Sequence, residues 1–162
     1  MCYSLSLVPT SVCCKREDDS SATLHVANVG DARVVVSHKQ KAMRLSRDHR
    51  AEDPSEIQRI QRCGGLVFKS RVLGILAVSR SLGDHGLKEF VSGKPHTTSF
   101  HGATAGDFVV IACDGLWDVM ADEEVVAFVN NVASKESAAQ LLIDEAIRRK
   151  SADNITVVVS WI

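Results

Sequence analysis

Three aspartates in this sequence lie in turns beside strongly apolar runs, a place where a chain can hold ligands for a metal ion. They are Asp31, Asp114 and Asp153. A fourth, Asp118, follows Asp114 by four residues, so a helical turn after Gly115 would point both side chains the same way. Because strand ends bring distant parts of a chain together, we expect the four carboxylates to share one site.

A group of buried carboxylates needs positive charge nearby, because mutual repulsion and loss of hydration both oppose burial. The local basic candidates are Arg33, Arg71 and Arg80. A divalent ion with oxygen ligands neutralises three or four acids at once, which is the chemistry of Mg²⁺ and Mn²⁺. Zinc is disfavoured, since no set of cysteines and histidines has a suitable spacing. Taken singly, each acid is also typical of an ordinary turn or helix cap.

Two β-rich runs flank the first of these acids. Residues 23–29 and 32–37 are separated by Gly30 and Asp31, which predicts a tight β-hairpin. A helix is expected to follow further along the chain. Its signals are Asp53 as N-cap, Pro54 in the first turn, Glu56 at the capping-box position, Ile57 and Ile60 as an apolar stripe, and a stop at Gly64-Gly65.

The second half of the chain begins with an apolar run, 108–113, that predicts a buried strand ending at the acids. Asp122 is the expected N-cap of a helix, and a second helix is expected over about 134–150. Residues expected to face the core from that second helix are Ala138, Leu141, Leu142 and Ile147. The final run, 155–162, is continuously apolar and predicts a strand buried on both faces. We see no repeat or linker, so residues 1–162 are expected to form one α+β domain.

Composition excludes several classes of function. The formal net charge is −1 and the pI about 6.6, so no basic surface invites nucleic acid. No apolar run approaches the roughly 20 residues needed to cross a bilayer, and the opening residues do not match a signal peptide. Five cysteines without C-x-x-C spacing suggest reduced thiols, and hence a location in the cytoplasm, the nucleus or both.

Five segments, in order, resemble the metal-dependent protein Ser/Thr phosphatases of type 2C, the PPM family. FVVIACDGLWDV is similar to that family's D-G-[LIVF]-W-D-V signature. The other four are LHVANVGDARVVV, LSRDHRAEDPSEIQRIQRCGGLV, RVLGILAVSRSLGD and SADNITVVVSWI. The resemblance runs from about Thr10 to the C-terminus, and residues 1–9 are atypical of the family.

The resemblance implies a fold of two antiparallel β-sheets sandwiched between helices, incomplete at the N-terminus of this chain. It also implies hydrolysis of phosphoserine and phosphothreonine in proteins by a water held at two Mg²⁺ or Mn²⁺ ions, with a third, weaker ion in a complete site. Asp114 and Asp153 match core metal ligands, and Asp31 and Asp118 match acids of the third ion. Asn154 is expected to orient its neighbour and Gly115 to allow a sharp turn, while Trp117 is expected to anchor the segment in the core.

The family's catalytic residues proper have no counterpart in the sequence given. Its phosphate-binding arginine and its D-G-H-G-G motif, which carries the general acid, do not occur here, and Asp84-His85-Gly86 lies in a different block. We therefore assign no catalytic residue and expect His85 to be an ordinary loop histidine. Open sheet edges lead us to expect a homodimer or a swapped assembly. Two other hypotheses are a non-catalytic phosphoprotein-binding module and a hydrolase of small phosphoesters.

Overall fold

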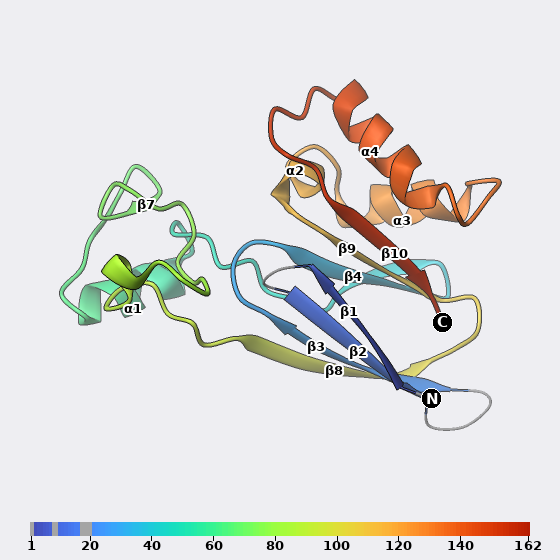
Figure 1. Cartoon of the computed structure of the whole chain (residues 1–162), viewed down its shortest axis with the longest axis horizontal. Coiled ribbons are helices and arrows are strands. Elements are labelled where there is room, and N and C mark those ends of the chain that lie inside the picture. Colours follow the sequence, from blue (N-terminus) through green and yellow to red (C-terminus); the bar gives the residue numbers. More distant parts are fainter. Residues whose placement is uncertain (1, 8–9, 17–20) are drawn as a thin grey trace.

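The computed structural model describes residues 2–7, 10–16 and 21–162 and shows a two-sheet β-sandwich with a lobe at one end (Figure 1). Sheet A has the strand order β1-β2-β3-β8, all antiparallel. Its strands are β1 (Cys2–Leu7), β2 (Thr10–Arg16), β3 (Ala22–Asn28) and β8 (His96–Ala103). Sheet B has the order β10-β9-β4-β5, also antiparallel. Its strands are β4 (Arg33–His38), β5 (Lys41–Arg44), β9 (Phe108–Ala112) and β10 (Val157–Trp161).

The two sheets bury a common apolar core. Alternate residues of β3 and β4, among them Leu24, Val26, Val34 and Val36, meet between the sheets and are at most 2% exposed. The opposite face of sheet B carries Val35 and packs on three helices (Figure 1). These are α2 (Asp114–Trp117), α3 (Asp122–Asn130) and α4 (Ala138–Arg148). In the described part of the chain the helices of the sandwich lie on sheet B alone, and the expected α+β sandwich is confirmed with that asymmetry.

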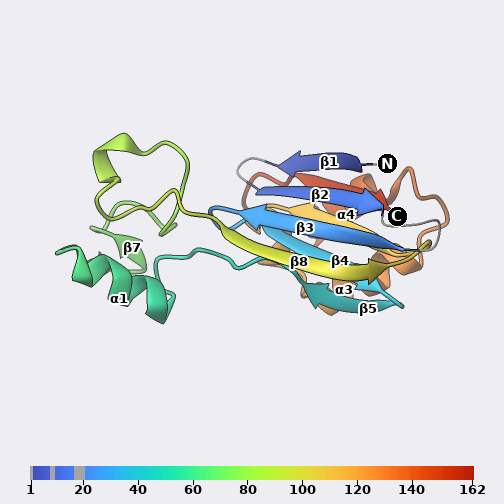
Figure 2. The same ribbon diagram turned by 90° about the horizontal axis from the view of Figure 1, so that it is seen from below.

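The predicted hairpin around Gly30 is wrong. β3 pairs with β2 and β8 in sheet A, whereas β4 pairs with β5 and β9 in sheet B, as Figure 2 shows from below. The residues between the two strands therefore cross from one sheet to the other, and Gly30, with φ of 103°, makes this bend. The two strands face each other across the core and bury their apolar faces there, instead of pairing edge to edge in one sheet. The local sequence does not distinguish these two arrangements.

The last strand also differs from the prediction. β10 is an edge strand of sheet B, and all five of its residues are only partly buried. Helix α4 is shorter than expected, and its buried stripe is Ala138, Leu142 and Ala146. Leu141 is 38% exposed and Ile147 60% exposed, so the prediction that both face the core is wrong. The observed stripe advances by four residues at each step, which keeps it on one face of the helix.

Residues 50–94 form the lobe, which extends from one end of the sandwich (Figure 1). Its elements are α1 (Pro54–Arg62), β6 (Val67–Phe68), β7 (Arg71–Val72) and the 3₁₀ turn η1 (His85–Leu87). Helix α1 begins as predicted, since the carboxylate of Asp53 accepts hydrogen bonds from the main-chain N–H groups of Ser55 and Glu56. The lobe has a small core of its own, formed by Ala51, Ile60, Val72 and Val91. No helix in the described residues is long and apolar enough to span a bilayer.

Candidate active site

A cavity of about 280 Å³ lies between the end of the sandwich and the lobe, and all four predicted aspartates line it. Its lining residues are Asp31, Arg50, Glu52, Ser70, Arg71, Ala77, Asp114, Asp118 and Asp153. The sandwich supplies the four aspartates and the lobe supplies the other residues. The convergence expected from the sequence is therefore observed, although Arg50, Glu52 and Ser70 were not anticipated as members of the site.

The central strand of sheet B positions two of the acids. β9 ends at Ala112, and α2 begins at Asp114, so this carboxylate lies two residues beyond a rigid, buried strand. Asp118 follows at the end of the same short helix, and its N–H donates to the carbonyl oxygen of Asp114 over 2.8 Å. Trp117 is 6% exposed, and its indole N–H donates to the Ala112 carbonyl oxygen at 2.9 Å. Trp117 is thus the buried anchor that fixes α2 against the sheet.

Gly115 brings the third acid close to the first two. A Cβ atom at this position would lie 2.3 Å from the carbonyl oxygen of Asn154, closer than real Cβ contacts allow. The φ angle of Gly115 is not in the left-handed region, so the sharp-turn explanation is wrong and close packing is the reason for glycine. The Ser151 hydroxyl donates to the Gly115 carbonyl oxygen at 2.6 Å and closes the same contact. The turn that carries Asp153 is therefore packed directly on α2.

Asp153 and Asp31 come from two further connections. The main-chain N–H of Asn154 donates to Oδ1 of Asp153 at 2.7 Å, so the contact between these neighbours is made by the backbone of Asn154. Asp31 lies in the crossing from β3 to β4. The next residue back, Gly30, accepts a hydrogen bond from the N–H of His49 at 2.8 Å. That contact ties the crossing to the segment that leads into the lobe.

The acids of the cavity act on one another electrostatically. Burial raises the pKa of Asp114, and the charges of Asp153 and Asp118 raise it further. Burial also raises the pKa of Asp31, with Asp114 as the next cause. These mutual effects agree with the cavity lining, in which all four carboxylates take part. The site is therefore short of positive charge, as the sequence suggested.

Arg50 supplies part of that positive charge. Its Nη2 lies 2.5 Å from Oδ1 of Asp118, which makes an ion pair across the cavity between lobe and sandwich. Of the three basic candidates from the sequence, only Arg71 lines the cavity. Arg33 binds Asp48 and Asp122, and its Cζ lies 5.1 Å from the centre of the Trp117 ring. Arg80 binds Glu56. These two arginines hold the structure around the site and do not neutralise the four aspartates.

The donor set fits a hard divalent cation in chemistry, because carboxylate oxygens are the ligands that Mg²⁺ and Mn²⁺ prefer. The geometry is open. Within residues 2–7, 10–16 and 21–162, no three His, Cys, Asp or Glu side chains are grouped closely enough to hold a metal ion as they stand. The four aspartates thus line one side of a common space. A metal ion bound there would need further oxygen ligands to complete its coordination shell.

The histidines lie outside the cavity lining. His85 is exposed in η1 of the lobe, as expected for a loop histidine. His49 is fully buried, and its Nε2 has no hydrogen-bond partner in the described structure. Burial, with the nearby charge of Arg80 as the next cause, lowers the pKa of His49 to about 4. His49 is therefore a neutral group at pH 7 that helps join the lobe to the sandwich.

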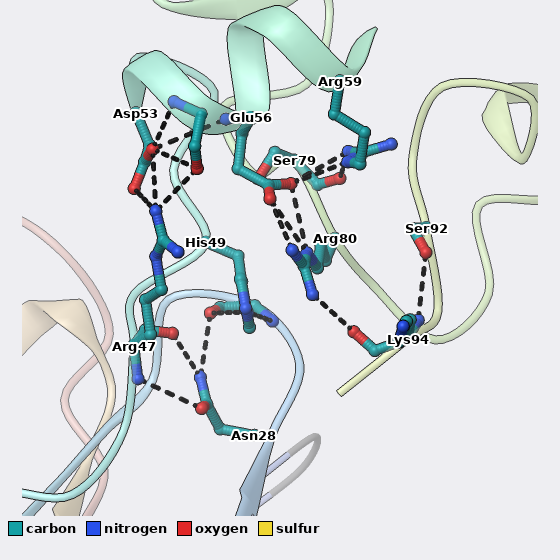
Figure 3. Close-up of polar contacts among 12 residues, drawn as sticks. Asn28, Arg47, His49, Asp53, Glu56, Arg59, Ser79, Arg80, Ser92 and Lys94 are labelled. Atoms are coloured by element: carbon teal, nitrogen blue, oxygen red, sulfur yellow. Dashed lines mark hydrogen bonds and ion pairs between the residues drawn. The ribbon is translucent and has the colours of Figure 1, made fainter. Parts of the chain in front are cut away.

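A polar network fastens the lobe to the sandwich, as Figure 3 shows. Glu56 is 2% exposed and lies between two guanidinium groups: Arg80 Nη2 is 2.5 Å from its Oε1, and Arg59 Nη2 is 3.0 Å from its Oε2. The prediction that Glu56 completes a capping box is wrong, because its carboxylate is used for this buried pairing instead. On the sandwich side, Asn28 binds both main-chain groups of Arg47.

Comparison of the sequence and the structure with known proteins identifies the family to which the antiparallel sandwich and its acid-lined cavity belong. The family model for protein phosphatase 2C matches residues 8–155. The protein phosphatase 2C homolog 1 of Schizosaccharomyces pombe is 49% identical over 137 residues, covering 84% of this chain and 40% of that protein. The homolog 1 of Saccharomyces cerevisiae is 42% identical over 139 residues, covering 86% of this chain and 50% of that protein.

Solved structures agree with the sequence relatives. A phosphatase from Toxoplasma gondii superposes with a TM-score of 0.80 at 30% identity, covering 87% of this chain and 49% of that chain. A sex-determining protein of Caenorhabditis elegans superposes with a TM-score of 0.78 at 30% identity, covering 94% and 40%. The chain belongs to the protein phosphatase 2C family, whose members are metal-dependent Ser/Thr phosphatases. It spans about half or less of the length of these relatives.

Arg50 and Glu52 are the charged residues among the site residues that sequence reasoning missed. Both lie just after Asp48-His49, within a segment that had been matched to the family, so a signal was present. Nothing in their local pattern separates them from exposed loop residues. Their place in the cavity follows from the way in which the lobe folds back on the end of sheet B.

Proposed function

We propose that this chain carries part of the metal-binding site of a protein Ser/Thr phosphatase that depends on Mg²⁺ or Mn²⁺. The observation that carries the proposal is the single cavity in which Asp31, Asp114, Asp118 and Asp153 meet. These acids come from three separate regions of the sequence, and each belongs to a segment that resembles the family. Family membership supports the same reaction class.

In this proposal Asp114 and Asp153 hold the core cations, and Asp31 and Asp118 hold the weaker one. Bound divalent ions would supply activation of a water molecule and neutralisation of phosphoryl charge. The contribution of the chain itself is orientation. Sheet B fixes α2 through Trp117. Arg71 lines the cavity, and although its Nη1 donates to the Ile75 carbonyl oxygen at 2.8 Å, its remaining N–H groups can donate to phosphoryl oxygens. The substrate class is phosphoserine and phosphothreonine in proteins.

The test is to measure cation binding and turnover separately with the 162-residue chain. Titration calorimetry with Mn²⁺ is expected to show binding that Asp114→Asn weakens at least tenfold. The matched control is Asp144→Asn on exposed α4, where the amide oxygen can still accept the hydrogen bond from Gln140, and this variant should bind Mn²⁺ like the wild type. Wild-type affinity in Asp114→Asn would overturn the metal assignment.

Turnover is then assayed on a phosphoserine peptide with Mn²⁺. Activity that disappears in Asp114→Asn but not in Asp144→Asn supports the phosphatase. Binding of the phosphopeptide without binding of Mn²⁺ would instead favour a phosphoprotein-binding module. Faster turnover of a generic phosphoester than of the peptide would favour a small-molecule substrate.

We also propose that the chain self-associates through β10. This strand is the last in the described order of sheet B, and its sequence, VVVSW, has no charged residue or proline to block pairing. Sedimentation velocity should show a dimer that Val159→Lys dissociates, because a charged residue in the pairing strand opposes sheet extension. A wild-type monomer at micromolar concentration would contradict the proposal.

A further inference from the structure

A second cavity, of about 240 Å³, lies against the first and shares two of its acids. Its lining residues are Gly115, Asp118, Val119, Lys150, Ser151, Ala152 and Asp153. Asp118 and Asp153 also line the first cavity, so these two side chains stand between the spaces. A molecule that reaches the four aspartates therefore has a neighbouring recess available for another of its groups.

Lys150 is the basic residue of this recess, and its charge is unpaired. The two residues before it are both committed: Arg148 binds Glu145, and Arg149 binds Glu145 and Glu124. Lys150 is exposed, and its side chain makes no hydrogen bond or ion pair with the residues that the structure describes. Two acids line the recess, Asp118 and Asp153. Of these, Asp118 forms an ion pair with Arg50.

The backbone at Lys150 is of a kind that favours glycine. Lys150 follows the C-cap of α4 with φ of 66°, and its N–H donates to the carbonyl oxygen of Ile147 at 2.8 Å. The next N–H, of Ser151, donates to the carbonyl oxygen of Ala146 at 3.0 Å, which completes a helix-ending motif. A side chain at this position is strained relative to glycine. The lysine gains from the negative end of the α4 dipole, but no acid of the described residues pairs with it, so its charge stays available to a ligand in the recess.

Lys150 could serve simply to neutralise Asp118 and Asp153. The proposed function makes this explanation of the Lys150 charge a poor one. If these carboxylates hold divalent cations, their charge is already neutralised, and a lysine beside them gains from a further anion. A substrate that places a carboxylate in the recess would satisfy Lys150 and keep its phosphoryl group at the first cavity.

We propose that Lys150 and its recess form a specificity subsite for an acidic residue close to the phosphorylated residue of the substrate. The inference rests on the proposed function, since it assumes that the phosphoryl group occupies the first cavity. An ion pair at a solvent-exposed position of this kind is expected to increase peptide affinity about threefold, and to lose that effect in high salt.

The experiment measures binding of three fluorescent phosphoserine peptides of equal length by anisotropy, with Mn²⁺ present. One has neutral flanks, one has glutamates on the N-terminal side and one has glutamates on the C-terminal side. The wild-type chain should bind one of the two acidic peptides about threefold more tightly than the neutral one. Lys150→Gly should remove that preference without weakening the neutral peptide, and Lys150→Arg should keep it.

A control separates the charge effect from the backbone effect. Lys39 has φ of 50° and is exposed in the β4–β5 turn, at the opposite end of β4 from Asp31. Lys39→Gly makes the same change in net charge and relieves the same kind of strain, so it should leave the peptide preference intact. Both glycine variants should unfold at the same urea concentration as the wild type or a higher one.

The outcomes separate the subsite from the function on which it rests. An equal preference in wild type and Lys150→Gly would overturn the subsite and leave the phosphatase proposal standing. A parallel loss of stability and of neutral-peptide binding in Lys150→Gly would show a structural role and would also overturn it. Failure of all three peptides to bind would remove the proposed function and the subsite together.

Discussion

Gly115 and Asn154 are packed so closely that the hydrogen of the glycine Cα is all that fits between them. A Cβ atom on Gly115 would lie 2.3 Å from the carbonyl oxygen of Asn154 and 3.0 Å from its carbonyl carbon. Both neighbours are backbone atoms, which cannot rotate out of the way as a side chain would. This contact holds the turn of Asp153 against the helix of Asp114.

Gly115→Ala should therefore separate these two acids as well as strain the fold. We expect a loss of about 1–3 kcal/mol in the free energy of unfolding, measured by urea denaturation, together with weaker Mn²⁺ binding by calorimetry. Gly86→Ala is the matched control, because nothing lies within 4 Å of a Cβ atom there and its φ is not positive. Similar effects from both variants would contradict the packing explanation.

Arg50→Gln should increase the affinity for Mn²⁺. The guanidinium of Arg50 occupies Asp118 and places a positive charge in the cavity, and both effects oppose a cation. Removal of that charge should tighten Mn²⁺ binding by about threefold to tenfold, measured by calorimetry at low ionic strength. Arg62→Gln on exposed α1 changes net charge equally at a distance from the acids, and unchanged binding is expected there. Weaker Mn²⁺ binding in Arg50→Gln would contradict the prediction.

Glu56→Ala should destabilise the lobe strongly. Truncation leaves Arg80 and Arg59, whose side chains are 16% and 26% exposed, without their shared carboxylate (Figure 3). Removal of one partner from a buried charge pair costs about 3 kcal/mol or more. Urea denaturation is the measurement, and Glu89→Ala, at an exposed position of the lobe, should change the free energy of unfolding by less than about 0.5 kcal/mol. A small effect of Glu56→Ala would show that the cluster does not hold the lobe.

Stability should fall in acid in two steps. The pKa of His49 is lowered from 6.5 to about 4, so between these values the unfolded chain binds a proton that the folded chain does not, and folding weakens as pH falls. Burial alone would raise the pKa of Glu56, but hydrogen bonds from Arg80 and Arg59 lower it from 4.5 to about 2. Its contribution is complete above pH 4.5 and is lost as pH falls towards 2.

Nuclear magnetic resonance can check the first step directly. The ring-proton shifts of His49 should stay close to their neutral values down to about pH 5, because its pKa is about 4. A titration midpoint near 6.5 would show that the ring is not buried as described. The second step is checked by Glu56→Gln, in which the decline in stability between pH 4.5 and 2 should be smaller than in the wild type.

Asp122→Ala should cost more than the loss of a helix cap. Asp122 is 8% exposed and binds Arg33 at 2.7 Å and Arg44 at 2.7 Å, which joins α3 to β4 and β5. We expect a loss of about 3 kcal/mol in urea denaturation, compared with about 1 kcal/mol for a cap. Glu123→Ala, on the exposed side of the same turn, is the control. A loss near 1 kcal/mol for Asp122→Ala would favour the simple capping role.

Features encoded by neighbouring residues were predictable from sequence. Asp53 caps α1 as expected because an N-cap needs only residues within one turn, and the apolar run 108–113 gave a buried strand because its length and composition suffice. The residue at which a helix begins is less well determined by the local sequence. Asp122 has the side chain of an N-cap, but Ala121 occupies that position, and Asp122 instead reaches Arg33 and Arg44. Those partners lie 89 and 78 residues away in sequence.

Strand partners were harder to predict. The apolar alternation of β3 and β4 is compatible with a hairpin and with two facing sheets, and only the complete set of strands decides between them. The apolar run 155–162 likewise suggested a central strand, yet β10 is at an edge. The four aspartates were found because turns at strand ends tend to cluster. Arg50 was missed because its partner, Asp118, is 68 residues away.

The passage of the chain from sheet A to sheet B has a mechanical consequence. Asp31 is attached to both sheets, whereas Asp114 and Asp153 are attached to sheet B alone. If one layer slides over the other, Asp31 shifts relative to the other two acids, and the width of the opening between them changes. Any ligand that bridges Asp31 and Asp114 would therefore link the two sheets and oppose their displacement.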